Sequence, residues 1–303
     1  MTDQLEVTPE APAKAKPSAV KERTQAEIVL RRFMRHRLAV GSLIAFGVIV
    51  LIAYGGAAIW KYSYFDITPD NSQSPSWEHP FGTDSIGHDG LAQVLRGLQQ
   101  SIKIALAVAL IATVLGTAWG AIAGYFGRHI DNALMRTADL VIILPGIAVA
   151  AALASVGGGS WWSIALIIGG LASASVSRLI RGVVLSLREQ DFIEAARALG
   201  ASDARIILRH LIPNALGPTI VSATILVAVG ILAETALSFL GFGVRAPDTS
   251  LGLLIQQAEG AVRTRPWLFY FPGIFIILIA LTVNFIGDGL RDAFDPKQTR
   301  VRR

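Results

Sequence analysis

The sequence predicts an all-α, polytopic membrane protein with six transmembrane helices, and three observations lead to this prediction. Of the 303 residues, 52% are hydrophobic and only 16% are charged, a composition too apolar for a soluble protein. Six apolar segments each approach the roughly 20 residues that a helix needs to cross a bilayer. The Lys and Arg residues gather in alternate connecting segments, as they do on the cytoplasmic side of membrane proteins.

Residues 1–37 are expected to form a cytoplasmic N-terminal tail. Pro, Ala and charged residues dominate residues 1–26, which have little to bury, so we expect this stretch to be disordered and dispensable. Residues 27–37 mix arginines with apolar side chains. This segment either lies as a helix on anionic membrane lipid or is only the positive flank of the next span. The first transmembrane helix is then expected at residues 38–60.

Residues 61–97 are polar and contain several prolines, so they predict an extracytoplasmic loop. The stretch from residue 91 to residue 102, which extends past the end of this loop, is typical of an amphipathic helix that leads into the membrane. Asp84, His88 and Asp89 are of types that bind metals, but capped turns between glycines are the favoured interpretation. We expect Asp84 and Asp89 to lie outside and to serve loop folding or partner docking, not metal binding.

Residues 98–290 carry the other five spans and form the core of the predicted permease. Gly116, Gly120 and Gly124 recur every four residues in the second span, a spacing that lets helices approach closely. Pro145 and Gly146 interrupt the third span. Residues 291–303 are expected to be a cytoplasmic C-terminal tail. The five spans are expected at residues 102–124, about 137–156, 161–180, about 215–240 and about 268–286.

The orientation follows from the distribution of positive charge. With the N-terminus inside and six spans, the cytoplasmic segments hold 21 of the 27 Lys and Arg residues. This excess predicts that both termini are cytoplasmic. The formal charge of +5 therefore reports membrane topology, and no nucleic-acid partner is expected.

A polar stretch at residues 181–214 interrupts the hydrophobic half of the chain. Asp191 and Glu194 have the spacing of a capping box, which predicts a helix that begins just after Asp191. Gly200 is the expected end of that helix, because Gly adopts the left-handed cap without steric cost. Asp203 follows in a second short helix, and Pro213 is expected to end it.

This polar stretch resembles the cytoplasmic loop signature of bacterial ABC importer permeases. Glu194, Ala195, Ala196, Gly200 and Pro213 have the spacing of the signature, whereas His210 and Ile212 replace its Ile and Leu. In that family the element is the coupling helix, which docks on the ATPase subunit. The resemblance implies an ATPase-coupling role for the following residues: Glu194, Ala195, Ala196, Arg197, Leu199, Gly200, Asp203 and Pro213.

Three further segments resemble the C-type permease subunit of dipeptide and oligopeptide importers. They are residues 79–89, 234–244 and 284–296, and they match in order and spacing, with His88 in place of the usual Arg. The resemblance implies the type I ABC importer permease fold in the bacterial cytoplasmic (inner) membrane. It also implies a second permease subunit, two ATPase subunits that bind ATP and Mg, and an extracytoplasmic peptide-binding protein.

Polar residues in or beside the spans are candidates for the translocation path. Charged groups there are costly and either pair with one another or line a water-filled path. Glu234, Arg178 and Asn284 are therefore possible translocation-path or gate residues. The alternative is that each makes a salt bridge or hydrogen bond inside the bundle.

No catalytic residues are assigned to this chain, and it is not expected to be an enzyme. It has no Gly-x-x-x-x-Gly-Lys-Ser/Thr phosphate loop and no Cys, and its five His residues form no metal-binding pattern, so neither a cofactor nor a metal is expected. One alternative is the same fold with another solute: glutathione, haem or a nickel complex. Others are an ion-driven secondary transporter or a membrane scaffold that transports nothing.

Overall fold

The computed structural model describes residues 25–295. The expectation that residues 1–26 are disordered falls almost entirely outside this range. The helices of the described part, including two π-helical segments and one 3-10 turn labelled η, are α1 (Gln25–Arg35), α2 (Arg37–Leu51), η1 (Ile52–Gly56), α3 (Ala57–Ile59), α4 (Gly90–Phe126), α5 (Arg128–Ile143), α6 (Gly146–Val156), α7 (Trp161–Arg188), α8 (Asp191–Ala198), α9 (Asp203–Ile206), η2 (Ile207–Leu211), α10 (Ile212–Phe239), α11 (Leu251–Ala258), η3 (Glu259–Ala261) and α12 (Trp267–Phe294).

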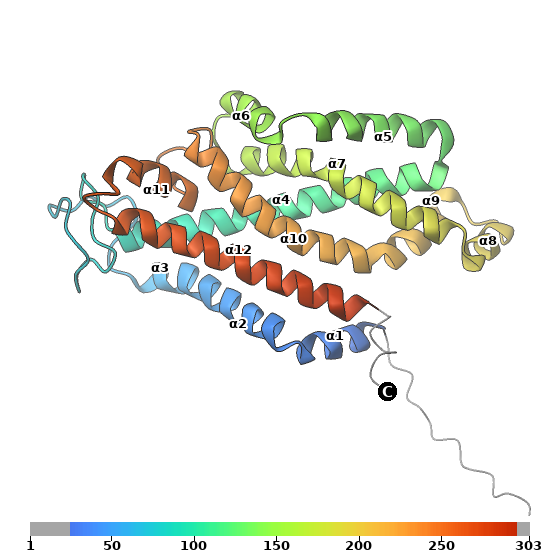
Figure 1. Cartoon of the computed structure of the whole chain (residues 1–303), viewed down its shortest axis with the longest axis horizontal. Helices are drawn as coiled ribbons and strands as arrows, with labels where there is room; N and C mark the ends of the chain where they lie inside the picture. Colours follow the sequence, from blue (N-terminus) through green and yellow to red (C-terminus); the bar gives the residue numbers. More distant parts are fainter. Residues whose placement is uncertain (1–24, 296–303) are drawn as a thin grey trace, which may run out of the picture.

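The long helices lie side by side in an elongated bundle (Figure 1). Helix α4 packs against α7 and α10, and α12 packs against α10 and α2. One end of the bundle, which we call the loop end, carries residues 60–89 and α11. The opposite end, which we call the α8 end, carries α8 and α9 (Figure 1).

Helices α4 and α7 approach each other closely along the predicted stripe of glycines. A Cβ atom on Gly116 would lie 2.5 Å from the Cβ of Val176, and one on Gly120 would lie 2.3 Å from the backbone oxygen of Ser177. Both distances are shorter than any normal contact, so only glycine fits. The spacing of these residues in the sequence therefore predicted a real helix–helix contact.

In the described part of the chain, five helices are long and apolar enough to cross a membrane. The remaining predicted span, the third along the chain, is the pair α5 and α6, which is bent by 89° at Leu144 and Pro145. The break lies where it was predicted, because the residue before a proline avoids the helical conformation. The pair makes up the predicted six, with both halves contacting α7 or α10.

Several helices are longer than the sequence predicted, including α5, which begins at Arg128, and α7, which continues to Arg188. Helix α4 begins at Gly90, so the amphipathic segment and the second span form one 37-residue helix, and the loop of residues 61–97 ends at Asp89. The Asp89 side chain accepts a hydrogen bond from the Ala92 N–H and caps this helix. Helix α12 continues to Phe294, past the start of the expected tail at residue 291.

Helix α1 is held against the end of α12. Phe33 is buried there beside Gly289, and the Arg32 guanidinium donates to the backbone oxygens of Ala293 and Asp295. The first and last helices of the described chain thus lie together, as Figure 1 also shows.

Candidate functional site

Helix α8 projects from the bundle at the α8 end and is attached by one apolar side chain. Ile193 is fully buried, whereas Phe192 and Leu199 are exposed, Leu199 to 88%. Glu194 and Arg197 are exposed as well. An exposed apolar surface next to charged side chains on a short helix is typical of a site where another protein binds.

The C-terminus of α8 is closed by a Schellman motif, as the sequence predicted for Gly200. The Ala201 N–H donates to the Ala196 oxygen, and the Gly200 N–H donates to the Arg197 oxygen. Gly200 has φ of +78°. No heavy atom lies within 4 Å of the position that a Cβ on Gly200 would take. The requirement for glycine is therefore conformational and not a matter of space.

The prediction of a capping box at Asp191 was wrong. The N-cap residue is Gln190, whose backbone oxygen accepts from the N–H groups of Ile193 and Glu194, and no side chain caps the helix. Asp191 is instead the first helical residue. Its carboxylate, with that of Glu194, lies in the first turn, where negative charge is favourable to the helix dipole.

The prediction that Pro213 ends a second short helix was also wrong. Segments α9, η2 and α10 run on without a break, so Pro213 lies inside a continuous helix, just after a π-helical segment. The preceding segment is π-helical, which shifts the backbone hydrogen-bond partners at this point. The Asn214 side chain also donates to the His210 oxygen, at 2.7 Å.

Tyr125, at the end of α4, fixes the corner between α8 and α9. Its hydroxyl donates to the Asp203 carboxylate at 2.6 Å, and the Arg197 guanidinium lies 5.9 Å from the centre of its ring. Arg188 donates to the backbone oxygens of Gly124 and Tyr125, both at 3.2 Å. Residues of α7, α8 and α9 therefore all contact the end of α4 at Tyr125, a residue that the sequence did not single out.

The three possible gate residues lie on different helices and make no contact with one another in the described part. Glu234 is fully buried and accepts from the Ser101 and Ser238 hydroxyls, at 3.0 and 2.7 Å. Asn284 donates to the backbone of its own helix. In this conformation Glu234 and Asn284 both make hydrogen bonds inside the bundle. A structural hydrogen bond of this kind was the alternative to a gate role in the sequence analysis.

Arg178 belongs to a pair of ion pairs that join α5 to α7. It contacts Asp139, and Arg181 makes a bidentate pair with Asp131, with N–O distances of 2.5 and 2.6 Å. Such paired geometry is the strongest form of the Arg–carboxylate interaction. The two pairs attach the first half of the bent span to its neighbour.

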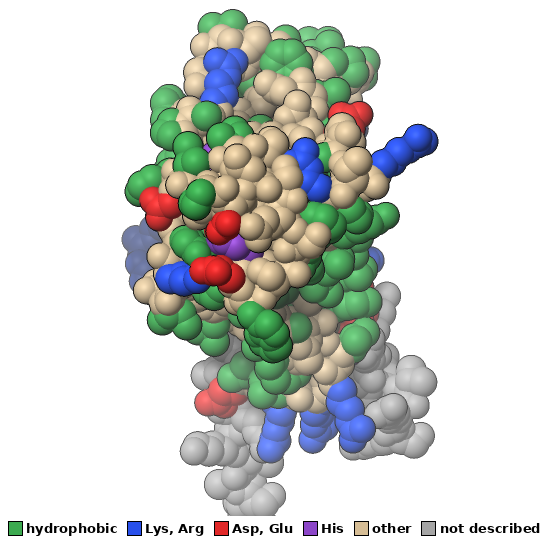
Figure 2. Space-filling model, turned by 90° about the vertical axis from the view of Figure 1, so that its left-hand side faces the viewer, with side chains coloured by type: hydrophobic (Ala, Val, Ile, Leu, Met, Phe, Trp, Pro, Cys, Tyr) green, Lys and Arg blue, Asp and Glu red, His purple; other side chains and the backbone are tan. Residues whose placement is uncertain are grey.

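Acidic side chains hold together the loop end. The Asp84 carboxylate accepts from the backbone N–H groups of Ile86, Gly87 and His88, and from the His88 ring at 2.7 Å. Partial burial acts to raise the pKa of Asp84, but the hydrogen bonds from His88 and the backbone outweigh it and lower the pKa below its usual value. Acidic side chains and a histidine are visible together on this end (Figure 2).

Asp89 is the buried centre of the same loop. Its two oxygens accept from the Trp60 indole at 2.9 Å and lie 2.8 Å from Nδ1 of His79, and one of them also caps α4. The stacked ring of Tyr62 covers His79. Within residues 27–295, no three His, Asp or Glu side chains are grouped to hold a metal ion. The carboxylates of this loop therefore do the structural work of turns and caps.

Comparison with known proteins assigns the family. Residues 116–300 match the family model described as binding-protein-dependent transport system inner membrane component. The chain belongs to this family. Residues 24–75 also match the N-terminal TM domain of oligopeptide transport permease C. As a family member, the chain is a multi-pass permease component of a transport system that includes other subunits.

Two relatives and one solved structure agree with this assignment. The oligopeptide transport system permease protein OppC of Mycobacterium tuberculosis is 42% identical over 279 residues, which are 91% of this chain and 96% of the relative. The dipeptide transport system permease protein DppC of Alkalihalophilus pseudofirmus is 38% identical over 88% of each chain. An inward-facing structure of the MetNI methionine ABC transporter shares the fold, with a TM-score of 0.54, 19% identity, and 67% and 97% coverage of this chain and that chain.

Proposed function

We propose that the chain is the translocating subunit of an ATP-driven importer of dipeptides or short oligopeptides. The observation that carries this proposal is the similarity of 38–42% over about nine-tenths of the chain to permeases named for oligopeptides and dipeptides. Glutathione, haem and nickel complexes are the competing solutes. The chain itself binds none of the ATP, which we assign, with Mg, to two partner ATPase subunits.

Helix α8 is the proposed contact with the ATPase. Its exposed Leu199 and Phe192 offer an apolar surface, and buried Ile193 attaches the helix to the bundle. Because Tyr125 joins the α8–α9 corner to α4, a displacement of α8 is passed directly to the ends of long helices. We propose that this connection couples α8 to alternating access, in which ATP binding favours one conformation of the bundle.

The remaining partners follow from the proposed orientation. Both termini and the α8 end lie on the cytoplasmic side, as the distribution of Lys and Arg supports. The loop end then faces outward, where an extracytoplasmic peptide-binding protein docks. We assign a second, similar permease subunit as the partner that completes the path; in the conformation described here, Glu234 is buried inside the bundle.

Reconstitution of the complete complex in liposomes tests the proposal. We expect uptake of a labelled tripeptide that needs ATP inside and continues when ionophores abolish every ion gradient. Uptake that stops with the ion gradient and ignores ATP would establish a secondary transporter instead. Uptake of glutathione, haem or a nickel complex without peptide uptake would show that the substrate class is wrong.

The coupling assignment has its own test. Leu199→Ser should weaken ATPase binding and uptake while membrane insertion remains normal, since Leu199 makes no contribution to the buried core. Met34→Ser is the matched control, because Met34 is an exposed apolar residue on α1 and away from α8. Equal effects of the two substitutions would remove the coupling role of α8.

A further inference from the structure

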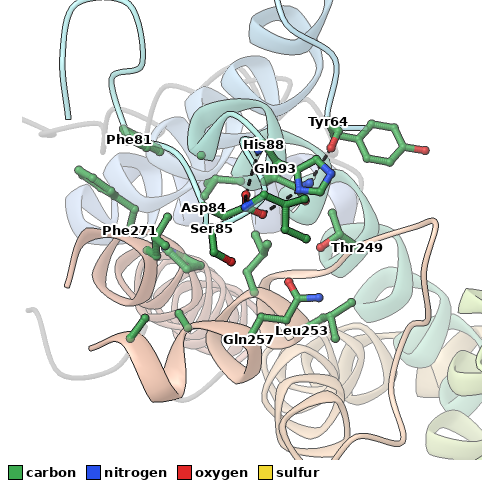
Figure 3. Close-up of a pocket in the computed structure, with 18 of the residues that line it drawn as sticks. Tyr64, Phe81, Asp84, Ser85, His88, Gln93, Thr249, Leu253, Gln257 and Phe271 are labelled. Carbon is green, nitrogen blue, oxygen red and sulfur yellow. Dashed lines mark hydrogen bonds and ion pairs between the residues drawn. The ribbon is translucent and has the colours of Figure 1, made fainter. Parts of the chain in front are cut away.

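A cavity of about 450 Å³ opens at the loop end (Figure 3). It lies between the loop of residues 60–89, the first turn of α4, α11 and the start of α12. This volume falls in the range of pockets that hold small ligands, roughly 300–1,000 Å³. The carboxylates that shape the loop are used in its turns, so the cavity is a separate feature from the Asp89 centre.

The floor and walls of the cavity are rich in aromatic side chains. The rings of Phe81 and Phe271 stack with their centres 3.9 Å apart, and Trp267 lies beside them. Leu253 and Leu254 of α11 add aliphatic surface. Surfaces of this kind favour a flat, apolar group that stacks on the exposed ring faces.

A few uncharged polar groups accompany these walls. Ser85 and Gln257 extend into the cavity from opposite sides (Figure 3), and neither side chain has a hydrogen-bond partner in the described part of the chain. Thr249 also lines the cavity and is only 5% exposed, and its hydroxyl has no partner there. A buried hydroxyl without a partner is costly, so it favours a ligand that supplies one.

The carboxylates that line the cavity already have partners within the chain. Asp84 is paired with His88, as described above. Asp248 is held bidentately by Arg96, at 2.8 and 3.1 Å, and contacts Gln100. Arg265 donates to the Ser72 hydroxyl on the exposed rim. A ligand with a positive charge therefore finds no free carboxylate among the residues that line the cavity.

We propose that this cavity binds a neutral aromatic or branched apolar group with an adjacent amide, as an apolar residue inside a peptide chain has. The apolar group stacks on Phe81, Phe271 and Trp267, and the amide meets Thr249, Ser85 and Gln257. Such a group comes either from a loop of a docked protein or from a free peptide. Only the position of the cavity on the outer face rests on the proposed function.

The direct test uses N-acetyl-L-phenylalaninamide as the probe and the purified transport complex in nanodiscs without ATP. We expect saturable binding in calorimetry. Thr249→Val should weaken binding by about 3- to 10-fold, the effect of one lost hydrogen bond. Ser85→Trp, a change at an exposed position, should block the cavity without disturbing the fold. Thr137→Val, which removes an exposed hydroxyl on α5, is the matched control and should bind as the parent does.

Two outcomes would overturn the proposal. One is the absence of saturable binding, or equal binding by the parent and Ser85→Trp. The other is tighter binding of the carboxylate analogue N-acetyl-L-phenylalanine, with this gain lost in Arg265→Gln. That result would show that the site prefers an anionic ligand to a neutral one. Because no transport is measured, a negative result here leaves the proposed function intact, and a failed uptake assay leaves this test intact.

A competition experiment distinguishes the two sources of the group. Addition of the peptide-binding protein should displace the probe if the natural occupant is a loop of that protein. Probe and binding protein that bind together without competition assign the cavity to free peptide. In both cases Ser85→Trp should abolish the probe signal, and a probe signal that survives this substitution would contradict the proposal.

Discussion

The two ends of the bundle hold their residues outside the spans in different ways. At the α8 end, a short helix projects, and its attachment depends on buried Ile193 and on Tyr125. At the loop end, residues 60–89 contain no long helix, and side chains such as Asp84 and Asp89 fix the backbone. The α8 end is therefore a short helix attached directly to the long helices, whereas the loop end is a small folded unit that depends on hydrogen bonds to carboxylates.

The largest expected effect concerns the centre of the loop end. Asp89→Ala leaves His79, the Trp60 indole and the first turn of α4 without their common partner. Removal of the carboxylate leaves buried hydrogen-bond donors unpaired, and each unpaired donor costs about 1–3 kcal/mol. We expect a large fall in the melting temperature and faster proteolysis within residues 60–89. Asp66→Ala is the control, because Asp66 makes an exposed hydrogen bond to Ser63. Similar losses for both would show that the loop end does not depend on its buried carboxylate.

At the α8 end, Gly200→Val should uncouple the transporter without unfolding it. A side chain at φ of +78° costs about 1–2 kcal/mol, and more when it is β-branched. The C-terminus of α8 should therefore shift, which lowers uptake per ATP hydrolysed at normal abundance. Gly200→Asn is the control, because Asn tolerates the left-handed conformation better. Uptake by Gly200→Val at the parent rate with ATPases bound would refute the coupling role.

A smaller effect is expected from Tyr125→Phe, which removes only the hydroxyl that binds Asp203. A hydrogen bond to a charged group contributes about 1.5–3 kcal/mol, and the lower end applies here because Asp203 is exposed. Hydrogen exchange of the amides in residues 189–203 should become faster, while the rest of the bundle is unchanged. Tyr54→Phe serves for comparison, since Tyr54 is exposed on η1. A double-mutant cycle with Asp203→Asn should show an interaction energy between the two positions. If the two effects on stability simply add, the proposed interaction is excluded.

The smallest effect is the acid dependence of the loop end. The folded pKa of Asp84 is lowered, so its contribution to stability is complete above the unfolded pKa of about 3.9 and is lost as pH falls through the folded value. The parent should thus lose stability in acid more steeply than Asp84→Asn does. Cysteine accessibility at Ile86→Cys, followed against pH, measures this opening. An identical acid profile in the presence and absence of Asp84 would contradict it.

Hydropathy and local rules predicted much of this structure. Six spans, the break at Pro145, the close approach along Gly116 and Gly120, and the end of α8 at Gly200 each have a local sequence pattern that indicates them. Such features have one dominant cause each. For the spans it is burial in lipid, and for the glycines it is the absence of a Cβ atom.

Other features depend on contacts between distant segments and were not predicted. Nothing near Tyr125 indicates that its hydroxyl meets Asp203, 78 positions later. The interior position of Glu234 depends on Ser101, which lies on another helix. Asp191 and Pro213 were misjudged for a local reason, since a backbone cap and a π-helical turn replaced the side-chain cap and the helix end. The coupling and translocation roles of these residues remain predictions.

The contact of α1 and α2 with α12 sets a limit on the order of biogenesis. Ala39 packs so closely on Gly289 that a Cβ atom there would lie 2.2 Å from its own, yet the two residues are 250 positions apart. The first span to leave the ribosome must therefore wait in the bilayer until the last one has been synthesised. During that interval the small residues of α2 lack their packing partner, and a chain truncated before α12 never acquires it.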